Sequence, residues 1–197
     1  ADSEQWAVGR PALTTSLRGL VDCVVEVRTL RNGVHSGQFG GALPDALTAL
    51  ARLLATLHDD RGRVAVAGLV SAPPPSVDVS EAELRTSAGA VEGVALIGDG
   101  PIAARLWREP AVSVLAIDAP RLSEAINQLV PVARAKVSLR LAPGQDPSAA
   151  MDALVTHLES HAPWGASVTV TRGSSAEPFL MAAGGAAYDA FRAGLTE

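Results

Sequence analysis

Residues 133–147 decide the fold, and they read Ala133-Arg134-Ala135-Lys136-Val137-Ser138-Leu139-Arg140-Leu141-Ala142-Pro143-Gly144-Gln145-Asp146-Pro147. Up to residue 141, small or apolar side chains alternate with polar ones, which is typical of a strand buried on one face only. Pro143 and Gly144 then turn the chain, and Asp146 can cap a helix that has Pro147 at its first position. The sequence therefore predicts a strand, a turn and a helix that runs to about residue 161.

The same alternation recurs within residues 12–30, which we expect to be extended. Asp22, Glu26 and Arg28 share one face, on which the apolar Val24 is the exception. The opposite face is apolar. The apolar face carries Val21, Cys23, Val25 and Val27. Further strands are expected at 64–69, 111–117 and 166–172.

A first helix is predicted over residues 43–58, where leucines recur at steps of four and three and Pro44 is tolerated in the first turn. Residues 70–110 are interpreted as an insertion, in which Ser80 and Glu83 form a capping box. Without the insertion and the short candidate strand at 64–69, the element order is β-α-β-β-α-β. This order predicts an α+β, ferredoxin-like two-layer sandwich, in which a four-stranded antiparallel sheet carries both helices on one face.

The two ends of the chain do not belong to this unit. We expect residues 1–18 and 173–197 to be stubs of a larger neighbouring domain, into which the unit at 19–172 is inserted. The first residue is Ala1 rather than Met, which suggests a processed or excised chain.

Composition narrows the class of protein. The 197 residues are 48% hydrophobic, which is enough for a sizeable core, and the net charge of −5 argues against a nucleic-acid partner. No apolar run approaches 18 residues, so no membrane span or membrane partner is expected, and no export signal is visible. Cys23 is the single cysteine and is interpreted as a buried hydrophobe. A reducing, cytoplasmic location fits this composition.

The segment His35-Ser36-Gly37-Gln38-Phe39-Gly40-Gly41 is the strongest candidate site. Glycines at this density let the backbone approach another surface closely, and the following helix would direct free N–H groups at the loop. The segment could present an imidazole and backbone donors to an anion, or it could be a flexible turn with a solvated histidine. Residue types alone leave both readings open.

Two other candidates are less specific. His157 and His161 have a metal-compatible i, i+4 spacing, but Leu158 replaces the glutamate that the zinc-protease helix motif requires, which argues against a metal. Arg140 is either a solvated strand residue or a carboxylate clamp, because a guanidinium can bind a carboxylate through two hydrogen bonds.

Taken together, these motifs resemble a known family. His35-Ser36-Gly37-x-x-Gly40-Gly41 is similar to the signature of the lid, or dimerisation, domain of the carnosinase-like di-zinc metallopeptidases, a clan that includes dipeptidases, aminoacylases and succinyl-diaminopimelate desuccinylases. Three further stretches match in order, namely Asp2-Ser3 with Pro11 and Leu17-Arg18-Gly19, then Leu106-Trp107-Arg108-Glu109-Pro110, then residues 135–147. The long insertion points to the dipeptidase branch.

The resemblance implies roles for individual residues. His35 would reach the active site of the partner subunit and stabilise the oxyanion of the tetrahedral intermediate. Arg140 would bind the substrate carboxylate, and Asn127 would also reach across the dimer. Ser36 and Gly37 would contribute to substrate binding beside His35.

Asp2 matches a zinc ligand, but the other ligands of a two-zinc site have no counterpart in this sequence. The resemblance therefore implies a homodimeric lid domain that acts with its own catalytic domain on a peptide or acyl-amino acid. The chain by itself would be inactive. The alternative is a stand-alone ferredoxin-like module that regulates another protein or binds a small ligand, because this topology serves many functions.

Overall fold

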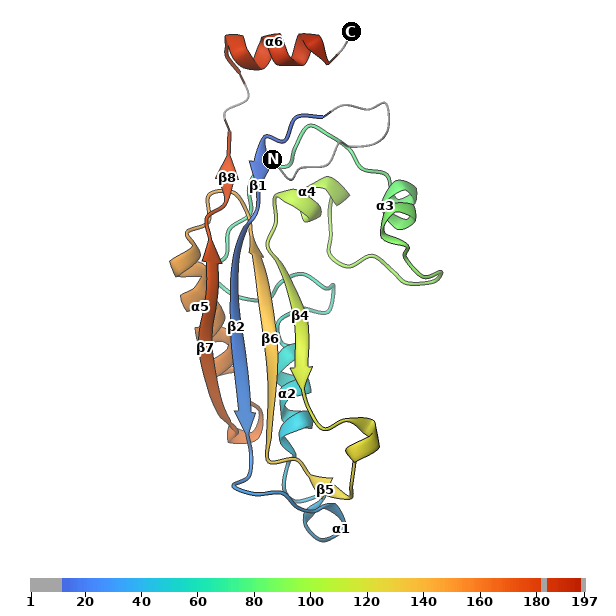
Figure 1. Cartoon of the computed structure of the whole chain (residues 1–197), viewed down its shortest axis with the longest axis vertical. Helices are drawn as coiled ribbons and strands as arrows, with labels where there is room; N and C mark the ends of the chain where they lie inside the picture. Colours follow the sequence, from blue (N-terminus) through green and yellow to red (C-terminus); the bar gives the residue numbers. More distant parts are fainter. Residues whose placement is uncertain (1–11, 182–183, 196–197) are drawn as a thin grey trace.

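A four-stranded antiparallel sheet forms the centre of the computed structural model, which describes residues 12–181 and 184–195 (Figure 1). Neighbouring strands are antiparallel throughout this sheet. In spatial order the strands are β4 (Ala111–Asp118), β6 (Val132–Leu141), β2 (Gly19–Arg28) and β7 (Ser167–Ala176). The predicted α+β class and the four-stranded antiparallel sheet are confirmed.

Both predicted helices cover one face of this sheet (Figure 1). Helix α2 (Ala46–Ala55) packs on β2 and β6, and α5 (Pro147–Ser160) packs on β2 and β7. Asp45 caps α2 by accepting a hydrogen bond from the Thr48 N–H at 2.8 Å. Asp146 caps α5 in the predicted way, with Pro147 at the first position. The caps satisfy N–H groups that a helix start leaves without partners.

The core lies between the sheet and these two helices. Val24, on the other face of β2, is 36% exposed, whereas its apolar neighbours along the strand are fully buried. Burial raises the pKa of the Cys23 thiol to about 11, so this side chain stays protonated and behaves as a small hydrophobe. The larger fully buried side chains include Val21, Val25, Val27, Leu50, Leu53, Val137, Leu139, Leu141, Leu154 and Leu158.

Two predicted elements differ from the structure. The helix expected over 43–58 is shorter, because Asp45 has an extended backbone and fixes the first turn at the next residue. No strand forms over 64–69, where Val64 makes only an isolated bridge with His58. Gly68 has a φ of 86°, which is left-handed and ends the extended conformation there.

The insertion contains two short helices, α3 (Glu81–Ala88) and α4 (Ile102–Trp107). The capping box between Ser80 and Glu83 is present at the start of α3, as predicted. Helix α4 was missed because only six residues form it, which is too few for an apolar periodicity to be visible.

Two small sheets mark opposite ends of the long axis (Figure 1). The proximal end is defined by β1 (Ser16–Leu17) and β8 (Phe179–Leu180), with α6 (Ala186–Gly194) beyond them. The distal end is defined by β3 (Val34–His35), β5 (Gln128–Leu129) and α1 (Ser36–Phe39), with the single turn η1 (Leu122–Glu124) close by. A second turn, η2 (Pro163–Gly165), joins α5 to β7, which runs four residues beyond the predicted 172.

We predict that the two faces of the sheet respond very differently to truncation. Leu139→Ala should lower the free energy of unfolding by about 2–5 kcal/mol, because it leaves a cavity in a closed core. Val24→Ala, on the opposite face, should cost less than about 1 kcal/mol. Urea denaturation followed by circular dichroism measures both, and equal losses would contradict the assigned core.

Candidate functional site

The distal end brings four of the predicted site residues together, namely His35, Ser36, Gly37 and Asn127. His35 pairs with Gln128 in the β3–β5 ladder, and the Ser36 N–H donates to the Asn127 carbonyl oxygen at 3.0 Å. The Gln128 side chain also lies directly over Gly33, so any side chain at position 33 would collide with it. Two segments far apart in the sequence thus form one tip.

The exposed His35 imidazole has a defined orientation in this tip. Its Nδ1 accepts a hydrogen bond from the Gly37 N–H at 3.0 Å, which makes His35 the N-cap of α1. A ring nitrogen that accepts carries no proton, so the proton of the neutral ring lies on Nε2. The ring therefore offers an Nε2–H donor to a group outside its own loop.

The glycines of the loop serve this geometry. A Cβ atom at Gly37 would lie 2.9 Å from His35 Cε1, and the imidazole would have to move. A Cβ atom at Gly40 would collide with the Ser36 carbonyl oxygen, which belongs to the backbone and cannot give way. Several helix N–H groups that we expected to be directed at the loop have partners elsewhere. Gly37 donates to His35 Nδ1, Ala46 to the Val130 carbonyl oxygen and Thr48 to the Asp45 carboxylate.

Arg140 lies at the proximal end, on the face of the sheet that the helices leave uncovered. Its neighbours across the strands are Leu20 on β2 and Ala111 on β4. Among the described residues no carboxylate pairs with Arg140, whereas Arg134 and Lys136 on the same strand both have acidic partners. Arg140 is therefore available to an anion from outside the described residues.

His35 and Arg140 are far apart within one chain. The ten residues of β2 separate the proximal from the distal end, and a strand rises about 3.3 Å per residue, which gives about 30 Å. A dipeptide is much shorter than this distance. One copy of the chain cannot hold both side chains against the same small substrate.

No group of three or more His, Cys, Asp or Glu side chains suited to a metal ion occurs in residues 12–181 and 184–195. Asp2, the predicted zinc ligand, lies outside the described residues. His157 and His161 stack on each other with ring centroids 4.1 Å apart, and His157 Nε2 lies 3.0 Å from Thr56 Oγ1. The described residues therefore do not fit a zinc site.

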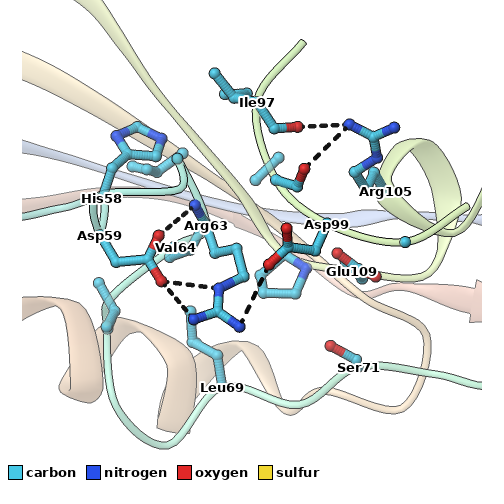
Figure 2. Close-up of a pocket in the computed structure, with 17 residues that line it drawn as sticks. His58, Asp59, Arg63, Val64, Leu69, Ser71, Ile97, Asp99, Arg105 and Glu109 are labelled. Carbon is cyan, nitrogen blue, oxygen red and sulfur yellow. Dashed lines mark hydrogen bonds and ion pairs between the residues drawn. The ribbon is translucent and has the colours of Figure 1, made fainter. Parts of the chain in front are cut away.

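A cavity of about 580 Å³ lies between the turn after α2 and the insertion (Figure 2). Arg63 crosses it, 2.8 Å from an Asp59 carboxylate oxygen and 3.7 Å from one of Asp99. Hydrogen bonds from Arg63 hold the pKa of Asp59 below its ordinary value. None of the predicted site residues within the described ranges lines this cavity. The sequence could not indicate the cavity, because separate segments form its walls.

A family model described as a peptidase dimerisation domain matches residues 15–166. The chain belongs to this family. The dimerisation domain is 34% identical over 193 residues to the cysteinylglycine-S-conjugate dipeptidase of Corynebacterium striatum, which covers 96% of this chain and 42% of that relative. It is 29% identical over 162 residues to the beta-Ala-His dipeptidase of Rattus norvegicus, and the match covers 77% of this chain and 33% of that relative.

Solved structures agree on the fold. Human carnosine dipeptidase 1 superposes with a TM-score of 0.71 at 24% identity, covering 95% of the dimerisation domain and 42% of that chain. An M20 family metallo-carboxypeptidase of Sulfolobus solfataricus superposes with a TM-score of 0.80 at 20% identity, covering 98% of the dimerisation domain and 52% of that chain. The chain thus spans less than half the length of the two curated relatives above. No helix in the described part of the chain is long and apolar enough to cross a membrane.

We predict that His157 makes the stability of the domain depend on pH. Burial, and then the neighbouring His161, lower the pKa of His157 from its ordinary 6.5. The unfolded chain therefore binds a proton at His157 more readily than the folded domain does. The free energy of unfolding should be highest above about pH 6.5 and should fall as the pH drops through the folded-state pKa. His157→Gln should flatten the fall seen between about pH 7.5 and about pH 5 in urea titrations.

His161→Gln is the matched variant, because it removes one cause of the shift and keeps His157. It should reduce the fall only partly. An unchanged profile in His157→Gln would contradict the assignment.

Proposed function

We propose that this chain is the lid and dimerisation domain of a zinc-dependent exopeptidase, a dipeptidase-like amide hydrolase that acts as a homodimer in the cytoplasm. One observation carries the proposal. The histidine tip and Arg140 lie at opposite ends of a strand about 30 Å long, so a complete site needs the distal end of one copy and the proximal end of another.

The edge strand β4 supports a dimer of a particular geometry. Val114, Leu115 and Ile117 on this edge are 43%, 58% and 51% exposed, so β4 is an apolar edge strand that no other described strand pairs with on its outer side. The other edge, β7, is rich in Ser and Thr and carries Arg172 in an ion pair with Asp152. A second copy should therefore pair along β4.

Two-fold symmetry then accounts for the separation of the two ends. If β4 pairs antiparallel with β4 of a second copy, the strands run in opposite directions across the interface. The distal end of one copy comes beside the proximal end of the other. His35 and Asn127 of one subunit would thereby approach Arg140 and the catalytic domain of its partner.

We predict that Leu115→Lys disrupts the dimer. The substitution occurs twice in a symmetric interface and places like charges opposite each other. The dissociation constant of the dimer should therefore rise about 100-fold. Thr169→Lys, on the opposite edge strand, is the matched control and should stay dimeric. Light scattering after size exclusion gives the masses. A wild-type monomer at every concentration, or a dimeric Leu115→Lys, would contradict the interface.

Within such a site, the chain supplies a neutral imidazole donor and a guanidinium cation. The His35 Nε2–H would donate to the oxyanion that forms when the amide carbonyl is attacked, and the Gly37 N–H on Nδ1 would keep the ring in the required tautomer. Ser36 would line the same tip. Arg140 would hold the substrate carboxylate through two hydrogen bonds and so fix the position of the scissile amide.

The zinc ions would be held by a catalytic domain joined to this chain through residues 1–18, which include Asp2, and 173–197. These ions would supply Lewis-acid activation of the amide or of water. The described residues offer no place for them, so the chain by itself should not turn over a dipeptide. Both described ends of the chain lie at the proximal end, which is where Arg140 would meet such a domain (Figure 1).

Relatives suggest which substrates to test first. The two dipeptidases reported above are named for cysteinylglycine S-conjugates and for beta-Ala-His, and both substrate types end in a free carboxylate. We propose a dipeptide substrate for this protein, with an acyl-amino acid as the second choice. Family membership favours this reading over a stand-alone ligand-binding module.

We predict that His35→Ala in the full-length enzyme lowers kcat about 10²- to 10³-fold with little change in KM, as expected for a lost oxyanion donor. Heterodimers then test whether the histidine acts across the interface. In the first, one subunit carries His35→Ala and the other lacks its zinc ligands. In the second, one subunit carries both changes and the other is wild type.

The two pairings have opposite outcomes. If His35 serves the partner, the first heterodimer keeps one complete site and about half of wild-type activity, and the second keeps none. If His35 serves its own subunit, the first is inactive and the second retains about half. The latter result would reject the assignment across the interface.

A further inference from the structure

The uncovered face of the sheet has charges arranged in layers along its long axis. Near the distal end, Glu26 pairs with Arg134 at 2.7 Å and with Arg28 at 3.1 Å. In the middle, Asp22 pairs with Lys136 at 3.5 Å. Each basic side chain in these two layers therefore has a carboxylate partner.

The layer at the proximal end breaks this pattern. Arg140 faces Leu20 across the β6–β2 ladder, and Arg18 lies two residues before Leu20, which makes it a diagonal neighbour of Arg140 on the same face. Such neighbours are about 7–8 Å apart, within reach of two long side chains. Within the described ranges, neither guanidinium has a hydrogen-bonding or acidic partner.

Arg18 is held in a fixed backbone frame. It connects β1 to β2, and the next residue, Gly19, lies so close to β7 that a Cβ atom there would be 2.8 Å from the Ala176 carbonyl oxygen and from Pro178 Cδ. Its side chain is half-buried. Burial, and then the charge of Arg140, lower the pKa of Arg18, which is the effect expected of two cations that share a site without an anion.

We propose that Arg18 is a second carboxylate-binding residue, which together with Arg140 forms a two-guanidinium site for the terminal carboxylate of the substrate. This inference rests on the proposed function, because it deepens the role given there to Arg140. The anion would relieve the repulsion between two positive charges that the fold already holds together. Each guanidinium can present a fork of N–H donors to a carboxylate oxygen pair.

The arrangement has a consequence for specificity. A neutral carboxamide cannot compensate two cations and would leave donors and charge unpaired, so the site should reject it strongly. The substrate class is therefore a dipeptide with a free terminal carboxylate. A blocked or amidated peptide should be a poor substrate.

The experiment compares cysteinylglycine with cysteinylglycinamide in the full-length enzyme. Arg18→Gln should raise KM for the carboxylate about 10- to 100-fold, leave its kcat nearly unchanged, and leave the kinetics of the amide unchanged. The preference for carboxylate over amide should therefore fall by the same factor. Arg18→Lys keeps the charge without the fork and should fall between wild type and Arg18→Gln.

Two controls separate binding from a structural role. Arg134→Gln lies on the same face and pairs with Glu26, and it should leave the preference unchanged. Arg18→Gln should not lower stability in urea, because it removes a repulsive charge rather than an ion pair. If turnover is too slow to measure, equilibrium binding of the two probes gives the same ratio.

The outcomes distinguish this inference from the function on which it rests. If Arg140→Gln abolishes the preference and Arg18→Gln keeps it, Arg18 is not part of the carboxylate site and the inference is overturned. If wild type shows no preference, or Arg140→Gln keeps it, the role proposed for Arg140 fails as well. If Arg18→Gln lowers activity equally on the carboxylate and the amide probe, and also lowers the stability of the protein in urea, Arg18 has a purely structural role.

Discussion

The unbroken pairing of β2 with β6 is the constraint on which the rest of the molecule depends. All ten residues of β2 pair in register, from Gly19 opposite Leu141 to Arg28 opposite Val132. Because both strands alternate in the same register, the buried apolar residues of β2 meet apolar neighbours of β6 on the helix side, and the charged pairs form on the other side. A slip of one residue would exchange the two faces. The same ladder sets the length of the sheet, and so the distance between its two ends.

The flanking strands adapt to this central pair by local irregularities. The register between β2 and β7 shifts between Val21 and Cys23, where the Asp22 carboxylate accepts a hydrogen bond from the Ser174 N–H at 3.3 Å. Gly173 is needed there, because a Cβ atom would collide with that carboxylate. On the opposite side, the shift between Val114 and Ala116 leaves Leu115 as the bulged residue. Bulges increase local twist, and the bulged Leu115 is left largely exposed on this edge strand.

The distal tip shows how a short loop can hold a histidine ready without burying it. The imidazole is fixed by one backbone hydrogen bond and by the absence of side chains at neighbouring glycines, rather than by packing. Such a residue keeps its full access to solvent and to another subunit. It also has few contacts to stabilise it, so its orientation depends strongly on Gly37.

The sequence by itself determined the two alternating strands, the capped helices and the order of elements, because these follow from local periodicity and from residues such as Asp146 and Pro147. Residue types also singled out the His35 segment and Arg140 as candidates. Resemblance to a family was needed to add Asn127 and to assign the roles, since spacing alone could not separate a carboxylate clamp from a solvated arginine. The failed strand at 64–69 has a local cause, because Gly68 ends the extended conformation. Only the tertiary structure decided which candidates lie together. His35 joins Asn127 through the β3–β5 ladder, Arg140 is left beside Arg18, and about 30 Å of strand keeps the two sites apart. These relations depend on pairing between distant segments, which no local pattern records.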